Sequence, residues 1–528
     1  MGLRRIDYSR SNLVAEIASI CKADPATVDA KLHSTFFEEF FNHEGVRTLL
    51  VEHPYVDRDY LEDFAFYYSK CFTPPAHSCG RIHVFRSQFD DVQLASALER
   101  ADASWAALAA CDEDYLGFIV VKPLPNTPIG RTCLRTYPTS GTGRHFPVLR
   151  DYKAHILGHT VSFDTLAFQE QDREVAACAT SALWSAFHGT GTKYNHAIPT
   201  PVEITRHATE RHSSSTNDSL PARSFPASDG LSLEQMADAV RKLGLEPYSV
   251  AVSERQHLQG ELYAYLKCGL PAVLAIQLLD VTNVIDPSLD TPEYKGGHAV
   301  TVAGFHLVDG PAMPLGTTGV KFKAARLDKV YCHDDQVGPF SRMVLGPRKF
   351  LHPHDNRPIR TPFATLDSSW DLHNIAALPY AMLVPTYPKM RLKFATALEA
   401  VLEFMAALQC VRPGVDLEWD VYLTTNRGLT RDIASTEALS GVYRSVLLTT
   451  PLPRFMWRAI AADMNGVELF ELILDATDLE QGKHFIRGIE YDNAVLAPFR
   501  GAVGISTAGF KNAALGAVEY FQTTPLVP

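Results

Sequence analysis

The middle of the chain carries an ordered series of helix and strand signals, which limits the fold more than any other feature. Ser232 and Gln235 form a capping box, apolar residues then recur at helical spacing, and Gly244 can end the helix, so a helix is predicted here. Further along, the segments 298–305 and 330–334 read as strands. The middle of the chain therefore combines helices with strands.

The length of 528 residues predicts roughly two to four domains. We expect an N-terminal α/β region at 1–165, a central domain at 166–385 and a C-terminal α/β region at 386–528. A polar stretch at 207–229, rich in Ser, Thr and Pro, predicts a mobile surface loop in the central domain. The other clear signals are a helical face at 36–41, a helix at 394–408 and strands at 115–121, 419–423 and 469–474.

Charge and cysteine content exclude several classes of protein. The formal net charge is -11 and the basic clusters are short, so the chain lacks the basic surface that nucleic-acid binding requires. Nine scattered cysteines do not suggest a disulfide framework and favour a reducing compartment. No apolar signal core follows the first residues, and the apolar stretches are too short to span a bilayer. We expect a soluble cytoplasmic protein that binds neither nucleic acid nor membrane.

A cysteine near the start of a predicted helix is the first chemical candidate. The segment 168–188 predicts a helix from Asp172 onward, because Asp172 can cap the N-terminus and apolar residues then recur at helical spacing. Cys178 lies within the first two turns, where the positive end of the helix dipole favours a thiolate. Taken alone, a cysteine among small residues is more often a packed core residue.

A histidine and an acidic turn downstream supply the partners that such a thiol needs. His298 follows two glycines and begins a β-branched strand, and the strand at 330–334 ends at Asp334 and Asp335. Nucleophilic thiol catalysis needs a base next to the sulfur and a third group that orients the imidazole. The chain order Cys, His, Asp supplies all three, and Gln169 and Gln171 are available as oxyanion donors.

Together these segments resemble the papain-like cysteine peptidases, closest in style to the bacterial peptidases that process bacteriocin leader peptides. The segments 262–270 and 271–276 resemble the helix and first sheet strand of this family, and the resemblance covers only the central third of the chain. It implies an α+β fold, with a papain-like domain whose nucleophile helix packs on an antiparallel sheet, flanked by accessory regions. It also implies roles for individual residues: Cys178 as nucleophile, His298 as general base and acid, Asp334 as the orienting acid with Asp335 as its rival, and Gln171 beside the Cys178 backbone N–H as oxyanion donors.

The expected function is that of a thiol hydrolase that cleaves a peptide or isopeptide bond through an acyl-enzyme and needs no cofactor or metal. Its partners would be a peptide or protein substrate and, through the accessory regions, a further protein. Three alternatives stay open. They are a transglutaminase-like acyltransferase, a non-catalytic binding or scaffold protein with the same fold, and a metal-dependent enzyme that uses His298, His333 and the two aspartates.

Overall fold

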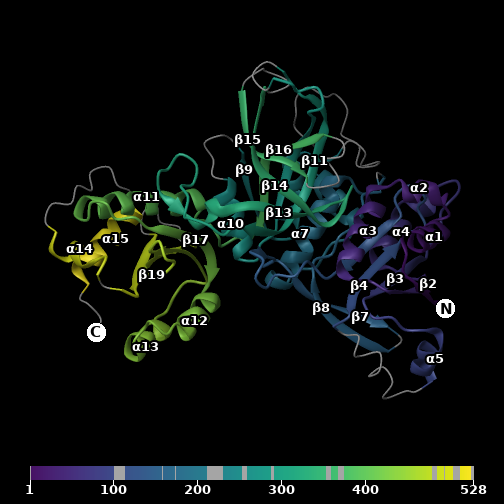
Figure 1. The fold of residues 1–528 in the computed structure, drawn as a ribbon, viewed down its shortest axis with the longest axis horizontal. Coiled ribbons are helices and arrows are strands. Elements are labelled where there is room, and N and C mark those ends of the chain that lie inside the picture. Colours follow the sequence, from purple (N-terminus) through teal and green to yellow (C-terminus); the bar gives the residue numbers. More distant parts are fainter. Residues whose placement is uncertain are drawn as a thin grey trace.

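The computed structural model describes residues 2–99, 113–156, 158–172, 174–210, 230–252, 258–286, 290–351, 358–366, 374–477, 484–492, 494–502 and 512–524. Within these residues lie three multi-stranded sheets and one two-stranded ribbon, combined with helices, so the fold is a mixed α+β fold, as predicted. The described strands pair antiparallel, except that β12 (Lys321–Phe322) pairs parallel with β17 (Glu418–Thr425). The chain passes from the N-terminal sheet through the central sheet to the C-terminal sheet (Figure 1).

The strands of the N-terminal sheet lie side by side in chain order. They are β1 (Gly2–Asp7), β2 (Thr48–Tyr55), β3 (Cys79–Phe85), β4 (Tyr115–Val121) and β5 (Ile129–Leu134). The helices of this region are α1 (Arg10–Cys21), α2 (Pro25–Asp29), α3 (Leu32–Glu44), α4 (Arg58–Phe66), the short 3-10 helix η1 (Tyr68–Lys70) and α5 (Asp91–Glu99). Phe36, Phe37, Phe40 and Phe41 of α3 are all buried, which confirms the predicted helical face. The predicted strand at 115–121 is also confirmed, as β4.

The central sheet carries the predicted helix and strand series. Its strand order is β15-β14-β13-β11-β10-β16-β9, and β6 pairs with β11 beside this path. The bounds are β6 (Arg144–His145), β9 (Glu246–Ala251), β10 (Ala272–Asp280), β11 (Glu293–Leu307), β13 (Leu327–Asp334), β14 (Gly338–Leu351), β15 (Pro358–Leu366) and β16 (Ile375–Thr386). The helices are α7 (Cys178–Tyr194), α8 (Pro201–Thr209), α9 (Leu233–Lys242), α10 (Leu258–Lys267) and the 3-10 helix η3 (Lys323–Arg326). The capping box that begins α9 forms as predicted.

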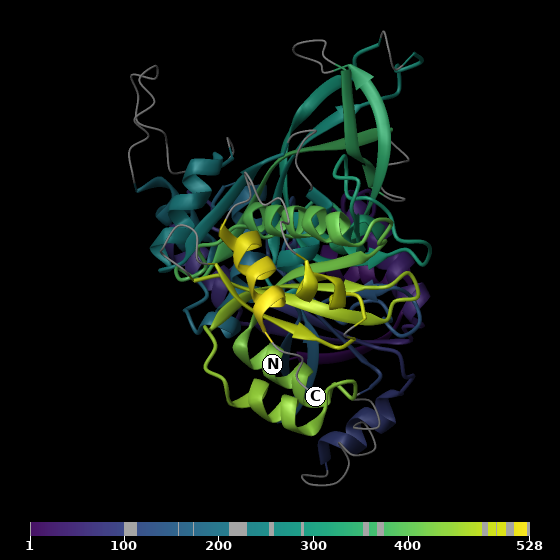
Figure 2. The ribbon, with the colours of Figure 1, turned by 90° about the vertical axis from the view of Figure 1, so that its left-hand side faces the viewer.

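The C-terminal sheet has helices on both faces (Figure 2). Its order is β12-β17-β18-β19-β20, with β18 (Phe455–Ala462), β19 (Glu468–Asp475) and β20 (Phe485–Glu490). The helices are α11 (Phe394–Val411), α12 (Asn426–Ser435), α13 (Gly441–Thr449), α14 (Ala497–Gly501) and α15 (Asn512–Thr523). Trp457 and Leu472 point into the main core with α11 and α15, whereas Met456 and Ile473 pack on α12 and α13. The predicted helix and both predicted strands of this region are therefore confirmed.

The expectation that every apolar stretch is too short to span a bilayer is wrong for α11, the one described helix that is long and apolar enough to cross a membrane by length and composition. Half of its most apolar window is buried inside the protein, and Val401, Phe404 and Leu408 lie in the main core. A core helix of a soluble protein passes the same test, so α11 is consistent with a soluble chain.

The three sheets are joined to one another. β6 comes from the segment before residue 165 and extends the central sheet, and β12 comes from the central segment and extends the C-terminal sheet. A two-stranded ribbon of β7 (Arg150–Ile156) and β8 (His159–Thr165) leads into the central region. One continuous core cluster includes buried residues of all three sheets. Of the predicted loop at 207–229, residues 211–229 lie outside the described residues, and 207–209 are the last residues of α8.

Candidate active site

Cys178 is the first residue of α7, so the predicted helix start at Asp172 is wrong. Asp172 instead closes a tight turn before the helix. Its Oδ1 accepts hydrogen bonds from the backbone N–H groups of Glu174, Val175 and Ala176 at 3.1, 2.8 and 2.7 Å. An aspartate before an apolar run has the same sequence pattern whether it caps a helix or such a turn. Cys178 therefore lies at the N-terminal end of α7, where the positive end of the helix dipole acts most strongly on its thiol.

Helix α7 is fixed against the central sheet. Ala182, Leu183 and Phe187 are buried, and the Thr301 hydroxyl on β11 donates to the Ala182 carbonyl oxygen at 2.5 Å. The N-cap residue of α7 is Ala177, and no side chain caps the helix. The first backbone N–H groups of a helix have no partner within the helix, so those at this end are suited to hold an anion.

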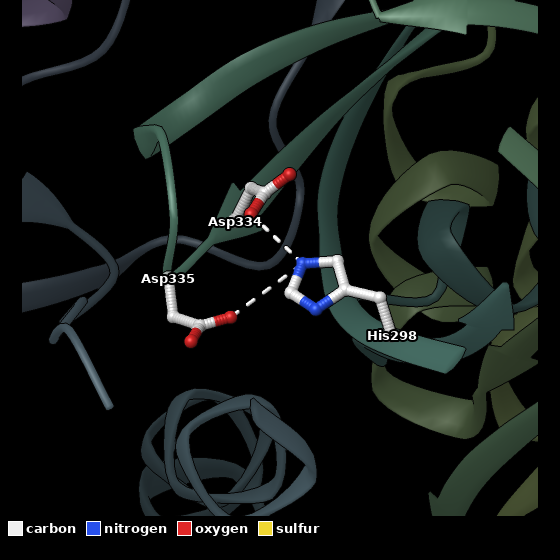
Figure 3. Close-up of side chains that lie close together, drawn as sticks. All are labelled: His298, Asp334 and Asp335. Carbon is white, nitrogen blue, oxygen red and sulfur yellow. Dashed lines mark hydrogen bonds and ion pairs between the residues drawn. The ribbon is translucent and has the colours of Figure 1, made fainter. Parts of the chain in front are cut away.

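His298 and Asp334 meet where β11 and β13 lie side by side. Nε2 of His298 lies 2.9 Å from Oδ1 of Asp334, and both side chains are buried (Figure 3). The Gln336 backbone N–H donates to the same carboxylate oxygen at 3.0 Å, which holds the carboxylate in place. The predicted contact between histidine and acid is therefore present at hydrogen-bonding distance.

The pKa of His298 reports on its neighbours. Burial acts to lower it, but the Asp334 charge, hydrogen bonds to Asp334 and Cys178, and the Asp335 charge outweigh burial and raise this pKa well above its usual range. Because Nε2 is directed at Asp334, Nδ1 is the ring nitrogen that can share a proton with the thiol. The three side chains can thus hold an imidazolium beside a thiolate, the form of cysteine that attacks carbonyl carbons.

Asp335 approaches the same imidazole less closely. Its Oδ1 lies 3.6 Å from His298 Nε2, beyond hydrogen-bonding distance (Figure 3). Burial raises the pKa of Asp335 to about 7, against the His298 charge, which lowers it. Neither carboxylate oxygen has a hydrogen-bond partner among the described residues. Of the two acids, Asp334 is the one in direct contact with the base.

The backbone of the acidic turn is held by a residue that sequence reasoning did not single out. Nε2 of His33 on α3 donates to the Asp335 carbonyl oxygen at 3.0 Å. His33 is fully buried, and burial lowers its pKa, so it serves as a neutral donor. It lies on the phenylalanine stripe of α3, so helical periodicity could have placed it in the core. Nothing in the sequence indicates that the acidic turn is its partner.

Gln171, the predicted oxyanion donor, has no hydrogen bond to the nucleophile among the described residues. Gln171 lies with Asp335 in the wall of a small polar pocket of about 230 Å³. Gln169, the other glutamine considered, is buried, and its Nε2 has no hydrogen-bond partner in the same part of the chain. The oxyanion role of Gln171 stays a prediction.

Three of the four residues expected for a metal-dependent enzyme lie close together, and His333 does not join them. Side-chain ligand atoms of His298, Asp334 and Asp335 lie within 4.8 Å of one another, which is close enough to share an ion. His333 points elsewhere. Its Nδ1 donates to the Ala167 carbonyl oxygen at 3.2 Å, and its ring packs edge-on against aromatic neighbours. An ion bound at His298 Nε2 would displace the proton that this nitrogen shares with Asp334.

Two exposed tyrosines lie near the nucleophile, and the sequence analysis did not single them out. Tyr294 on β11 is 43% exposed and Tyr380 at a bulge of β16 is 46% exposed. Burial raises the pKa of Tyr380, and the charges of Tyr294 and Cys178 raise it further, so the three side chains lie within electrostatic reach of one another. A tyrosine in a strand has no distinguishing pattern, so only the fold places these two at the site.

No protein-family model matches this chain, and a search of curated proteins found no match to its sequence. Any function therefore has to be inferred from the geometry of Cys178, His298 and Asp334.

Proposed function

We propose that this chain is a papain-like thiol hydrolase that cleaves a peptide or isopeptide bond. One observation carries the proposal. The buried imidazole of His298 has Nε2 at 2.9 Å from Asp334, the Cys178 thiol is among the groups that raise its pKa, and Cys178 is the first residue of a helix. A core cysteine needs neither of these neighbours, whereas a nucleophilic cysteine needs both.

The reaction follows from this arrangement. The Cys178 thiolate attacks the substrate carbonyl carbon, and the uncapped N–H groups at the start of α7 can stabilise the oxyanion. His298 then gives its proton to the leaving amine, which leaves an acyl group on the sulfur. Water, activated by His298 acting as base, attacks the acyl group and releases a carboxylic acid with the thiolate restored. Asp334 orients the imidazole throughout.

The test measures iodoacetamide labelling of each cysteine as a function of pH by peptide mass spectrometry. Cys410 is an internal control, because it is more exposed than Cys178 but has no predicted base. Cys178 should label faster than Cys410 near neutral pH by about tenfold or more, because an ordinary thiol is only a few per cent ionised there. The His298→Ala variant should remove this advantage and leave Cys410 labelling unchanged.

Two outcomes would contradict the proposal. If Cys178 labels no faster than Cys410, the thiol is not activated, and the binding or scaffold alternative is favoured. If peptide cleavage persists in Cys178→Ala but is lost on chelation, the metal alternative is favoured, with His298, Asp334 and Asp335 as ligands. Competition by an added amine for the acyl-enzyme distinguishes a hydrolase from an acyltransferase.

A further inference from the structure

A second cavity lies far from Cys178, at the opposite end of β11 from His298. Its volume is about 560 Å³, within the range of small-molecule pockets. Phe305 in its wall is seven positions along β11 from His298, which corresponds to roughly 20 Å at the rise of a strand. The wall combines segments from β6, α10, the end of β11 and η3, and we call it the cationic pocket.

Four basic side chains line the cationic pocket: Arg144, Lys267, Lys323 and Arg326. Asp309 is the one carboxylate in its wall among the described residues. Two acids behind the wall offset part of this charge. Asp420 lies 2.7 Å from Lys267 and 3.4 Å from Lys323, and Glu418 lies 3.0 Å from Arg326. Among the wall residues themselves, four basic side chains accompany one carboxylate, in a chain whose formal net charge is -11.

Of the four basic side chains in the wall, Arg144 is the one without a carboxylate partner among the described residues. Within that part of the chain it donates only to the Tyr331 hydroxyl at 3.1 Å and the Pro138 carbonyl oxygen at 3.4 Å. Nε of Arg326 is buried and has no hydrogen-bond partner in the same residues. Guanidinium groups bind phosphate and carboxylate oxygens in pairs, so the unused N–H groups of Arg144 in this wall favour an anion.

The walls are preformed by close packing of backbone segments. A Cβ added at Gly143 would lie 2.5 Å from the Leu307 carbonyl oxygen, and one at Gly304 would lie 2.4 Å from the Phe146 ring. Only glycine at these positions lets the β6 segment lie directly on the end of β11. The ring of His145 stacks on Phe305 with a centroid separation of 5.1 Å. Burial lowers the pKa of His145, and the charges of Lys323 and Lys267 lower it further, so two lysine charges act on this ring and favour its neutral form.

We propose that the cationic pocket binds a small organic molecule that carries several negative charges, as phosphate or carboxylate groups. The cavity is larger than a single inorganic anion needs, and its wall gathers basic residues from β6, α10 and η3 around one space. A ligand here would contact β6, α10, β11 and η3 together. This proposal does not depend on the chemistry at Cys178.

The test is isothermal titration calorimetry of the full chain with inorganic pyrophosphate and with citrate, at low and high salt. Saturable binding at one site that weakens with salt is expected for at least one anion. Binding of pyrophosphate alone assigns a phosphate ligand, and binding of citrate alone assigns a carboxylate. Arg144→Gln and Lys323→Gln should each weaken binding by about tenfold, as expected for loss of a charged hydrogen bond.

Lys321→Gln is the matched control. Lys321 lies two residues from Lys323 and pairs with Asp416, outside the wall, so its loss removes equal charge nearby and should change affinity by no more than about twofold. Melting temperatures without ligand check that each variant is folded, and Arg144→Lys replaces Arg144→Gln if the latter unfolds. The proposal is overturned if neither anion binds, or if Lys321→Gln weakens binding as much as the wall variants.

Discussion

Two adjacent carboxyl groups face one imidazole, but only Asp334 accepts a hydrogen bond from it. Asp334→Ala should therefore slow Cys178 alkylation at neutral pH by about tenfold or more, because the imidazolium loses its orienting partner. Asp335→Ala should change the rate by no more than about threefold. The measurement is the alkylation rate by mass spectrometry, with Cys410 as the reference thiol in each variant. Equal effects of the two substitutions would show that the acids act as a pair.

Asp335 also makes stability depend on pH. Its pKa is about 7 in the folded protein, against about 4 for an unfolded chain, so between these values the folded protein holds a proton that the unfolded chain has released. The free energy of unfolding must then fall as pH rises from about 4 to 7. His298, whose pKa is raised, contributes stability that is lost as pH rises through its folded value.

Asp335→Asn removes the first of these two effects. The free energy of unfolding of the variant minus that of wild type should therefore increase from about pH 4 to pH 7. The increase is at most about 4 kcal/mol, because each pKa unit corresponds to 1.36 kcal/mol. Urea unfolding at a series of pH values measures the difference. A difference that does not change with pH would mean that Asp335 is ionised in the folded protein throughout this window.

At the scale of elements, α3 and the start of β14 meet with no spare room beside the acidic turn. A Cβ at Gly338 would lie 2.5 Å from Cδ1 of Phe36, whose ring is held by contacts with Phe37 and Phe40. Gly338→Ala should cost about 1–3 kcal/mol of unfolding free energy, as overpacking does, and should slow Cys178 alkylation by moving Asp334.

The matched control for this overpacking is Gly441→Ala, because a Cβ at Gly441 would meet nothing within 4 Å. Combining Gly338→Ala with Phe36→Leu should recover part of the lost stability, since the smaller side chain leaves room for the added methyl group. Urea unfolding measures the wild type, the three single variants and the double variant. Additive losses in the double variant would show that the two residues do not compete for the same space.

The helices and strands differ in how well the sequence pattern predicts them. Helices α3, α9 and α11 and strands β4, β17 and β19 were predictable, because their apolar residues repeat over enough positions to define a face. The start of α7 was not, because Asp172 accepts three backbone N–H groups in a turn that mimics a helix cap. The two-residue strands β6 and β12 are too short to carry any periodicity.

Some contacts of the candidate site were likewise predictable from the sequence, and others were not. The resemblance predicted that His298 meets the acidic turn, and Nε2 of His298 lies 2.9 Å from Asp334. The preference for Asp334 over Asp335 depends on a difference between 2.9 and 3.6 Å, which only the packed sheet decides. The contacts from the N-terminal region, such as His33 to Asp335, join residues 302 positions apart and have no local signal.

At the scale of the whole molecule, the N-terminal region belongs structurally to the candidate site. The Tyr68 hydroxyl donates to Asp172 at 3.0 Å, and the Tyr67 hydroxyl donates to Glu174 at 2.9 Å, so η1 and the residue before it hold the turn that precedes Cys178. His33 holds the acidic turn from the other side. Both polar segments of the site are thus positioned by residues before 165, and they should lose their geometry if that region unfolds.

The continuous core predicts that the three sheets unfold together. His33 on α3 donates to the Asp335 carbonyl oxygen at 3.0 Å, Tyr265 packs on Trp457 at 5.5 Å, and Lys267 pairs with the buried Asp420, so the N-terminal region and the C-terminal sheet both contact the central region. Hydrogen exchange in increasing urea, followed by mass spectrometry, should show β3, β11 and β18 losing protection at one common denaturant concentration. The hairpin of α12 and α13 packs in a separate small cluster and should open at lower urea, which gives an internal comparison. If β18 instead opens with α12 and α13, the C-terminal sheet folds as an independent unit, and its contacts with α10 are those of a docked domain.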